Sequence, residues 1–68
     1  MNEERPIVFT ITNDTAKTYR IYTNDSRADG IISGVVLDNL TELETIRAMW
    51  ILSTLLNTSN YATLFEVD

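Results

Sequence analysis

The chain has 68 residues, no cysteine and no histidine, and its ten acidic and five basic residues give a net charge of −5. This length predicts one small globular domain over residues 1–68, and a hydrophobic content of 44% is enough for a core. Without Cys or His, the sequence excludes a thiolate nucleophile, an imidazole base and a zinc site built from those ligands.

The first half of the chain predicts a β-hairpin. Residues 1–5 are expected to be a frayed polar leader, and residues 7–12 alternate as a strand with Ile7, Phe9 and Ile11 on one face. Residues 13–16 are typical of a turn, because Asn and Asp tolerate tight bends. Residues 18–23 then read as the returning strand, with Tyr22 on the face away from the core.

Residues 24–30 (NDSRADG) are expected to form a polar loop. Asp25 and Asp29 precede Gly30, which superficially matches a calcium-binding loop. The match fails because the alignment puts Arg27 at a ligand position and Val36 where a bidentate Glu is needed. An ordinary loop is therefore predicted, with no metal.

Residues 31–37 (IISGVVL) allow two interpretations. The β-branched content favours a strand, which Gly34 would weaken or bulge. The alternative is an irregular apolar lead-in to a helix.

Residues 41–57 (TELETIRAMWILSTLLN) predict the only long helix. Thr41 followed by Glu44 is a capping box, which marks the start. A broad apolar side is expected to contain Ala48, Met49, Ile51, Leu52, Leu55 and Leu56. Leu43, Ile46 and Trp50 form a second, narrower stripe. Either loops or a curled sheet cover this stripe, or it is an interface centred on Trp50, since Trp is enriched in interface hot spots.

Residues 61–67 alternate again and predict a final strand. The expected fold is α+β, with the order β-β-(β)-α-β and one helix on one face of a mostly antiparallel sheet of three or four strands. If residues 31–37 are a strand, the helix is a crossover between strands that run in the same direction. The predicted core contains Phe9, Ile11, Ile21, Leu52, Leu55, Phe65 and Val67.

No residue pattern indicates an enzyme or a cofactor. The pairs Glu42 with Glu44 and Asp25 with Asp29 lie in a helix start and a loop, where acids are expected for structural reasons. No glycine-rich phosphate loop is present. The tyrosines invite a base-stacking interpretation, but the scattered Lys and Arg provide no basic groove, so direct nucleic-acid binding is not expected. Without a signal peptide or a long apolar run, no membrane segment is expected, and the predicted location is cytoplasmic.

The small size, the acidic charge and the β-β-(β)-α-β order resemble those of small bacteriophage proteins that bind and inhibit host enzymes, some of them by mimicking DNA. The likeness is one of size and topology, and it transfers no functional residue.

The sequence thus predicts a non-enzymatic protein-binding module, an inhibitor or regulator of a host protein, with DNA mimicry as one mode. The alternative is a structural or assembly subunit whose only partner is itself. A homodimer is expected, because so small a domain without disulfide or metal has little stability in reserve. The predicted partner-binding residues are Trp50, Ile46, Leu43, Tyr22 and Glu42.

Overall fold

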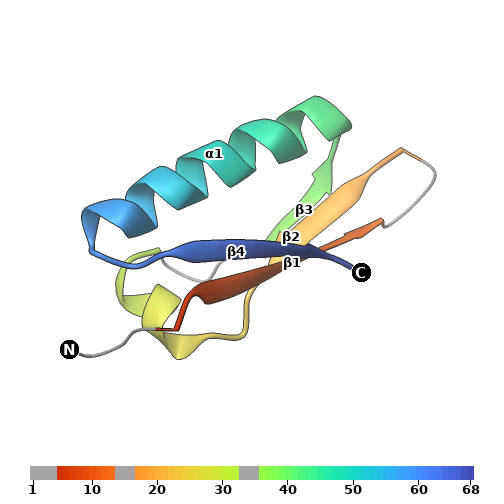
Figure 1. Ribbon diagram of the computed structural model, residues 1–68. Coiled ribbons are helices and arrows are strands. Elements are labelled where there is room, and N and C mark those ends of the chain that lie inside the picture. Colours follow the sequence, from red (N-terminus) through yellow and green to blue (C-terminus); the bar gives the residue numbers. More distant parts are fainter. Residues whose placement is uncertain (1–4, 14–16, 33–35) are drawn as a thin grey trace.

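Four strands form one sheet in the order β3-β2-β1-β4, and a single long helix packs against one face (Figure 1). The computed structural model describes residues 5–13, 17–32 and 36–68. The elements in chain order are β1 (Ile7–Asn13), β2 (Tyr19–Tyr22), the 3-10 helix η1 (Ser26–Gly30), β3 (Val36–Leu40), α1 (Glu42–Thr58) and β4 (Thr63–Val67). This architecture confirms the predicted α+β fold.

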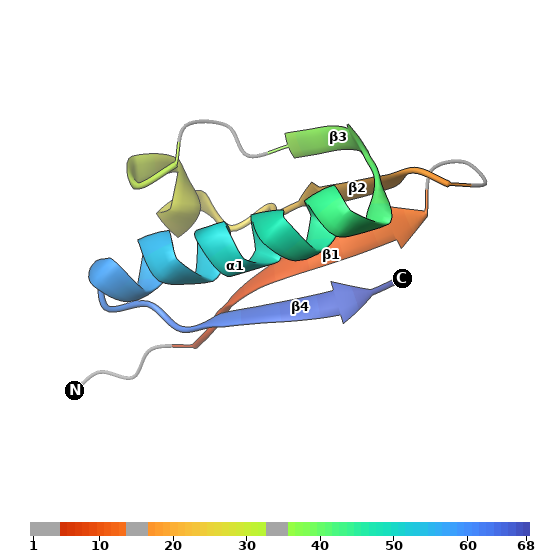
Figure 2. The same cartoon turned by 90° about the horizontal axis from the view of Figure 1, so that it is seen from above.

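β1 is a central strand and pairs on both edges. It runs antiparallel to β2, with Ile11 opposite Ile21, and parallel to β4, with Phe9 opposite Phe65. β2 also pairs antiparallel with β3. β3 and β4 therefore run in the same direction, as predicted for strands joined by a helix, but two strands lie between them (Figure 2).

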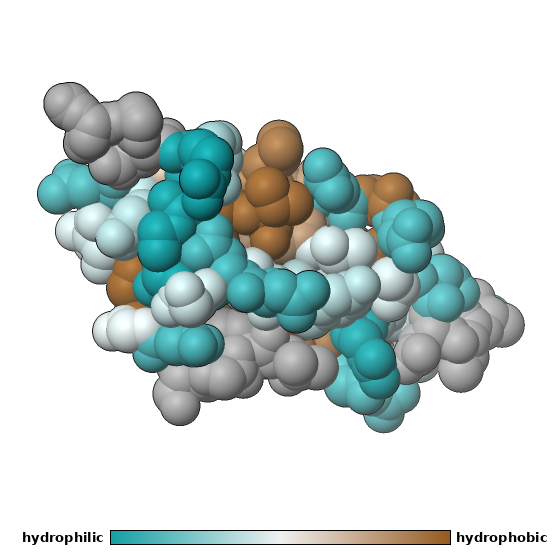
Figure 3. Space-filling model, turned by 90° about the horizontal axis from the view of Figure 1, so that it is seen from below, coloured by the Kyte–Doolittle hydropathy of each residue, from teal (hydrophilic) through white to brown (hydrophobic). Residues whose placement is uncertain are grey.

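The alternation in β1 decides which side of the sheet becomes the core. Ile7, Phe9 and Ile11 are buried beneath α1, whereas Val8 and Thr10 are only half-buried on the opposite face. That opposite face carries mainly hydrophilic side chains around a hydrophobic patch (Figure 3). Tyr22 lies there half-buried, as predicted from the alternation in its strand.

The predicted start of α1 is confirmed. The Thr41 side chain accepts a hydrogen bond from the Glu44 N–H at 3.1 Å, and the Glu44 carboxylate accepts one from the Thr41 N–H at 2.9 Å. The helix ends where Asn60 adopts a φ of 68° and the Tyr61 N–H donates to the Leu56 carbonyl at 2.9 Å. Asn tolerates this left-handed conformation, which redirects the chain into β4.

The strand predicted at residues 31–37 is wrong in its position. The third strand is β3, residues 36–40, and Ile31 and Ile32 form a turn that follows η1. The Ile32 N–H donates to the Ala28 carbonyl at 2.7 Å, so this end of the apolar run is bound to η1 and not to a strand. Gly34 and the rest of residues 33–35 lie outside the described residues, as do the leader residues 1–4 and the turn residues 14–16.

The predicted core is right for four of its residues and wrong for two. Phe9, Ile11, Ile21 and Leu52 are buried, and Phe65 packs against them half-buried. Leu55 is 43% exposed and Val67 is 79% exposed, while Leu56 and Ile7 are fully buried instead. The helix is rotated so that Leu52 and Leu56 meet the sheet, and this rotation leaves Leu55 on its flank. Ile51, which was placed on the broad apolar side, is exposed for the same reason.

The predicted polar loop contains a short helix with one buried residue. η1 begins after Asp25, whose carboxylate accepts a hydrogen bond from the Arg27 N–H, and it buries Ala28 completely. The last strand, which was predicted to begin at Tyr61, begins at Thr63. In the described part of the chain, no helix has the length and apolar character required to cross a membrane.

Candidate functional site

The outer surface of α1 exposes large apolar side chains. Leu43, Ile46 and Ile51 are each more than half exposed, and Trp50 is 77% exposed. Trp50 and the buried Leu52 lie about 200° apart around a helix, so the side chain that meets the sheet and the indole that meets solvent are on nearly opposite sides. The second stripe predicted from the sequence is therefore a real surface feature of the described structure.

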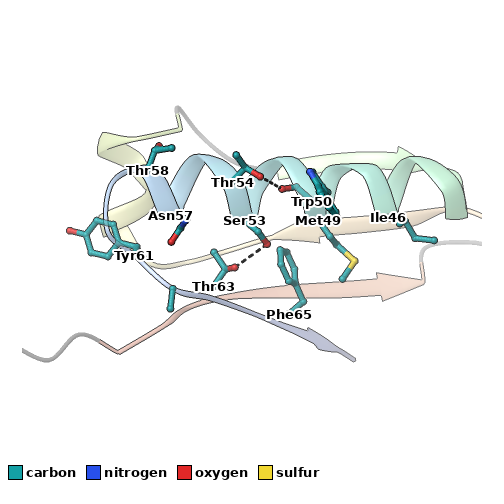
Figure 4. A pocket seen from close by; sticks show the side chains of 11 residues that line it. Ile46, Met49, Trp50, Ser53, Thr54, Asn57, Thr58, Tyr61, Thr63 and Phe65 are labelled. Carbon is teal, nitrogen blue, oxygen red and sulfur yellow. Dashed lines mark hydrogen bonds between the residues drawn. The ribbon is translucent and has the colours of Figure 1, made fainter.

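A groove of about 680 Å³ runs between α1 and β4 (Figure 4). Ile46, Met49 and Trp50 line it from the helix, and Phe65 lines it from the strand. The Phe65 ring stacks on Phe9 with 5.4 Å between ring centroids, which fixes this part of the wall to the core. The remaining lining residues are smaller or more polar: Ser53, Thr54, Asn57, Thr58, Tyr61, Ala62 and Thr63.

In one part of the groove, the hydroxyl groups are engaged in hydrogen bonds within the chain. The hydroxyl oxygens of Ser53 and Thr63 lie 3.1 Å apart and join α1 to the start of β4. The Thr54 hydroxyl donates to the Trp50 carbonyl at 3.0 Å, so it is occupied within the helix. The half of the groove toward the start of α1, around Ile46, Met49 and Phe65, is the apolar half.

A second, smaller hollow of about 280 Å³ lies on the outer side of the same helix. Ile46, Arg47, Trp50 and Ile51 line it, so Trp50 borders both hollows. We call the exposed residues Leu43, Ile46, Trp50 and Ile51 the apolar stripe of α1. An exposed indole between two hollows suits contact with a protein surface, because Trp combines a large apolar area with a polar N–H.

The structure separates the predicted partner-binding residues into two groups. Trp50, Ile46 and Leu43 lie together on α1, and Glu42 is exposed in its first turn. Tyr22 lies on β2, on the face of the sheet that α1 does not cover, so it is not part of this surface. The predicted partner-binding residues did not include Met49 or Phe65, which were assigned to the broad apolar side of the helix and to the core. The sequence alone does not indicate which flank of the helix meets which strand.

Arg27 ties the loop before β3 to the start of β1. Its guanidinium binds Asp25, with 2.6 Å between Nη2 and Oδ2, and donates to the Arg5 carbonyl at 3.0 Å. The hydrogen bonds that Asp25 accepts from the Arg27 side chain and from the Arg27 N–H lower the pKa of this carboxyl to about 2. The guanidinium also lies 5.5 Å from the centre of the Tyr61 ring. Asp25 and Arg27 are therefore engaged in structural contacts.

Other acidic residues are similarly engaged. Asp38 pairs with Arg20 at 3.2 Å, and Glu44 belongs to the capping box. Within residues 5–13, 17–32 and 36–68, no three acidic side chains gather in a way that would hold a metal ion. The described surface of α1 and β4 thus offers exposed apolar side chains beside hydroxyl and amide groups.

Comparison with protein-family models, with curated proteins and with solved structures finds no match for this chain.

Proposed function

We propose that this chain is a small, non-enzymatic protein-binding module that binds a foreign protein through the apolar stripe of α1. The observation that carries the proposal is Trp50, an indole 77% exposed between two hollows on a helix that is otherwise anchored in the core. Isolated apolar residues are common on protein surfaces, but contiguous exposed patches mark interaction sites. Trp is also among the residues whose truncation weakens protein complexes most.

An inhibitor or regulator of a host protein fits this proposal better than a catalyst. The sequence contains no Cys or His, and the groove is lined by apolar, hydroxyl and amide side chains without a charged group. The net charge of −5 would favour a partner with a basic surface around its apolar contact, because complementary charge accelerates association.

DNA mimicry has less support than apolar binding. A mimic needs free carboxylates spaced along one face, whereas Asp25 and Asp38 are paired with arginines and Glu44 caps α1. We therefore propose that the apolar stripe provides most of the binding energy. The remaining carboxylates would mainly affect the rate of association.

The test is a quantitative binding measurement with the partner that the chain captures from cells of its source. Trp50→Ala should weaken the affinity for that partner by about 30-fold or more, which corresponds to loss of a hot spot. Leu64→Ala is the matched control, since Leu64 is also exposed but lies on the face of the sheet away from α1. Equal affinity of Trp50→Ala and wild type would contradict the proposal. Absence of any stoichiometric foreign partner would instead favour the self-associating subunit.

A further inference from the structure

The outer edge of β4 is the edge of the sheet next to the groove. In the described part of the chain, β4 pairs only with β1 and ends the sheet. At its two ends, the Ile7 N–H donates to the Ala62 carbonyl and the Asp68 N–H donates to the Ile11 carbonyl, both at 2.9 Å. Backbone groups alternate along a strand, so Thr63, Phe65 and Val67 point their N–H and C=O groups to the free edge.

The side chains of the same three residues face the α1 side of the sheet. Thr63 and Phe65 line the groove, and Val67 follows them by alternation with 79% of its surface exposed. An incoming strand that bonds to this edge would thus lie along the open side of the groove. It would cover Val67 and the apolar half of the groove wall at the same time.

We propose that the occupant is the β4 strand of a second copy of this chain, paired antiparallel about a two-fold axis at Phe65. This register places Thr63 opposite Val67 of the second copy and the two Phe65 residues opposite each other. All three pairs join residues whose backbone groups face the free edge, so the pairing is self-complementary. The two sheets become one continuous eight-stranded sheet, with both helices on the same face.

The charges of the chain are compatible with this register. Each copy carries a charge of −5, so self-association requires that carboxylates stay apart. Glu66 lies opposite Leu64 of the second copy, and Asp68 lies opposite Ala62, so no carboxylate lies directly opposite another, and the two Glu66 side chains are diagonal neighbours across the axis. Both acidic residues also alternate to the face away from the groove.

The exposed apolar side chains supply about two thirds of the apolar area that a standard interface buries on one partner. Leu43, Ile46, Trp50 and Val67 are 57, 56, 77 and 79% exposed, which leaves roughly 330 Å² of apolar surface if about 200 Å² is taken for a fully exposed Trp and about 90 Å² for each aliphatic side chain. A standard interface buries about 800 Å² per partner, of which about 56 to 65% is apolar. Because both helices lie on one face, their Trp50-bearing flanks face each other across the axis.

This dimer goes beyond the proposed function, and because it covers Trp50 on the groove side, a second copy would compete with a foreign partner for that side chain. It covers the groove side of α1, whereas the outer hollow with Arg47 and Ile51 still faces solvent. Val67 and Ile51 therefore separate the two proposals. Val67→Lys should disrupt the dimer, and Ile51→Lys should disrupt binding of a foreign protein.

The first test is the mass of the full chain in solution. Sedimentation should give a dimer for wild type and Ile51→Lys at micromolar concentration, and a shift toward monomer of at least tenfold in dissociation constant for Val67→Lys. Val67 is exposed in the single chain, so circular dichroism should show that this variant remains folded. A wild-type chain that stays monomeric at several hundred micromolar would overturn the proposal.

The second test reads the register directly and does not depend on Val67→Lys folding. The chain lacks cysteine, so Thr63→Cys and Val67→Cys each introduce one thiol. Facing residues in this register have Cα atoms about 5.5 Å apart, within the range of about 4.4 to 6.8 Å that a disulfide spans. Oxidation of an equimolar mixture of the two variants should cross-link about half of the chains, which is the share present in mixed dimers. Oxidation of either variant alone should cross-link few. Equal cross-linking in all three samples, or none in the mixture, would overturn the register.

Discussion

β3 and β4 both lie at an edge of the sheet, yet only β3 carries features by which natural sheets keep an edge from pairing with another chain. Between the pairs Tyr19–Leu40 and Ile21–Leu37, β3 advances by three residues and β2 by two, so β3 contains one extra residue. Asn39 in this stretch has a φ of 60°. β4 pairs with β1 in a regular register from Thr63 to Val67.

The two edge strands also differ in their charged residues. Asp38 of β3 forms an ion pair with Arg20 on the neighbouring strand. β4 has the sequence TLFEV, without Lys or Pro, and its only charged side chain points away from the groove. A bulge and a local charge interrupt one edge, whereas the other is regular and has an apolar face. The difference indicates that β4 is the edge at which association is expected.

The largest effect is expected from a substitution in the core, and it tests whether both edge strands depend on that core for their stability. Leu52→Ala should lower the free energy of unfolding by about 2 to 5 kcal/mol, because it leaves a cavity where α1 meets the sheet. Amides of β3 and of β4 should then exchange faster together in hydrogen-exchange measurements. Leu55→Ala, on the exposed flank of the helix, is the control and should cost far less. Faster exchange at only one edge would show that the two edges unfold separately.

A smaller effect on stability is expected at the ion pair of Asp25 and Arg27, which lies beside Tyr61 just before β4. The pKa of Asp25 is about 2 when folded, below its ordinary value of 3.8, so its contribution to stability is present above pH 4 and is lost as the pH falls toward 2. Asp25→Asn should remove this contribution. The difference in unfolding free energy between wild type and Asp25→Asn should therefore shrink from pH 5 to pH 2. Thermal unfolding at several pH values measures it, and a difference independent of pH would contradict the assignment.

The smallest effect is expected at the β3 edge. Arg20→Ala removes one member of an exposed ion pair, and such pairs contribute about 0 to 1 kcal/mol. The self-association of the chain should not change, because β3 lies at the opposite edge from β4. Sedimentation of Arg20→Ala and Val67→Lys under the same conditions compares their effects on the dimer. A dimer weakened equally by both substitutions would mean that association does not use the β4 edge.

The sequence predicted most of the fold because local signals agreed with it. The capping box set the start of α1, and the alternation of Ile7, Phe9 and Ile11 set the buried face of β1. The third strand was misplaced because its position depends on pairing with β2, and a run of β-branched residues does not report that pairing. Ala28 was missed because its burial depends on η1 packing against distant residues.

The candidate site was predicted only in part, for a similar reason. The spacing of Leu43, Ile46 and Trp50 indicated a stripe that the main apolar side of the helix does not include, and these residues are exposed together. The spacing could not show that Met49 borders a groove beside this stripe or that Phe65 forms the facing wall, since this depends on how α1 crosses β4. Val67 was assigned to the core because its strand alternates correctly, but the helix does not extend over it.

The parallel pairing of β1 with β4 also has a consequence for how the chain folds. Ile7 and Thr63 are partners 56 residues apart, whereas β1 and β2 are neighbours in the chain. Closing a longer loop costs more entropy, so we expect the β1–β2 hairpin to form first and β4 to dock late. Until then β1, with the sequence IVFTITN, has one unpaired edge. In that interval the strand at the centre of the native sheet is the one most open to pairing with another molecule, so fast docking of α1 and β4 protects the chain from aggregation.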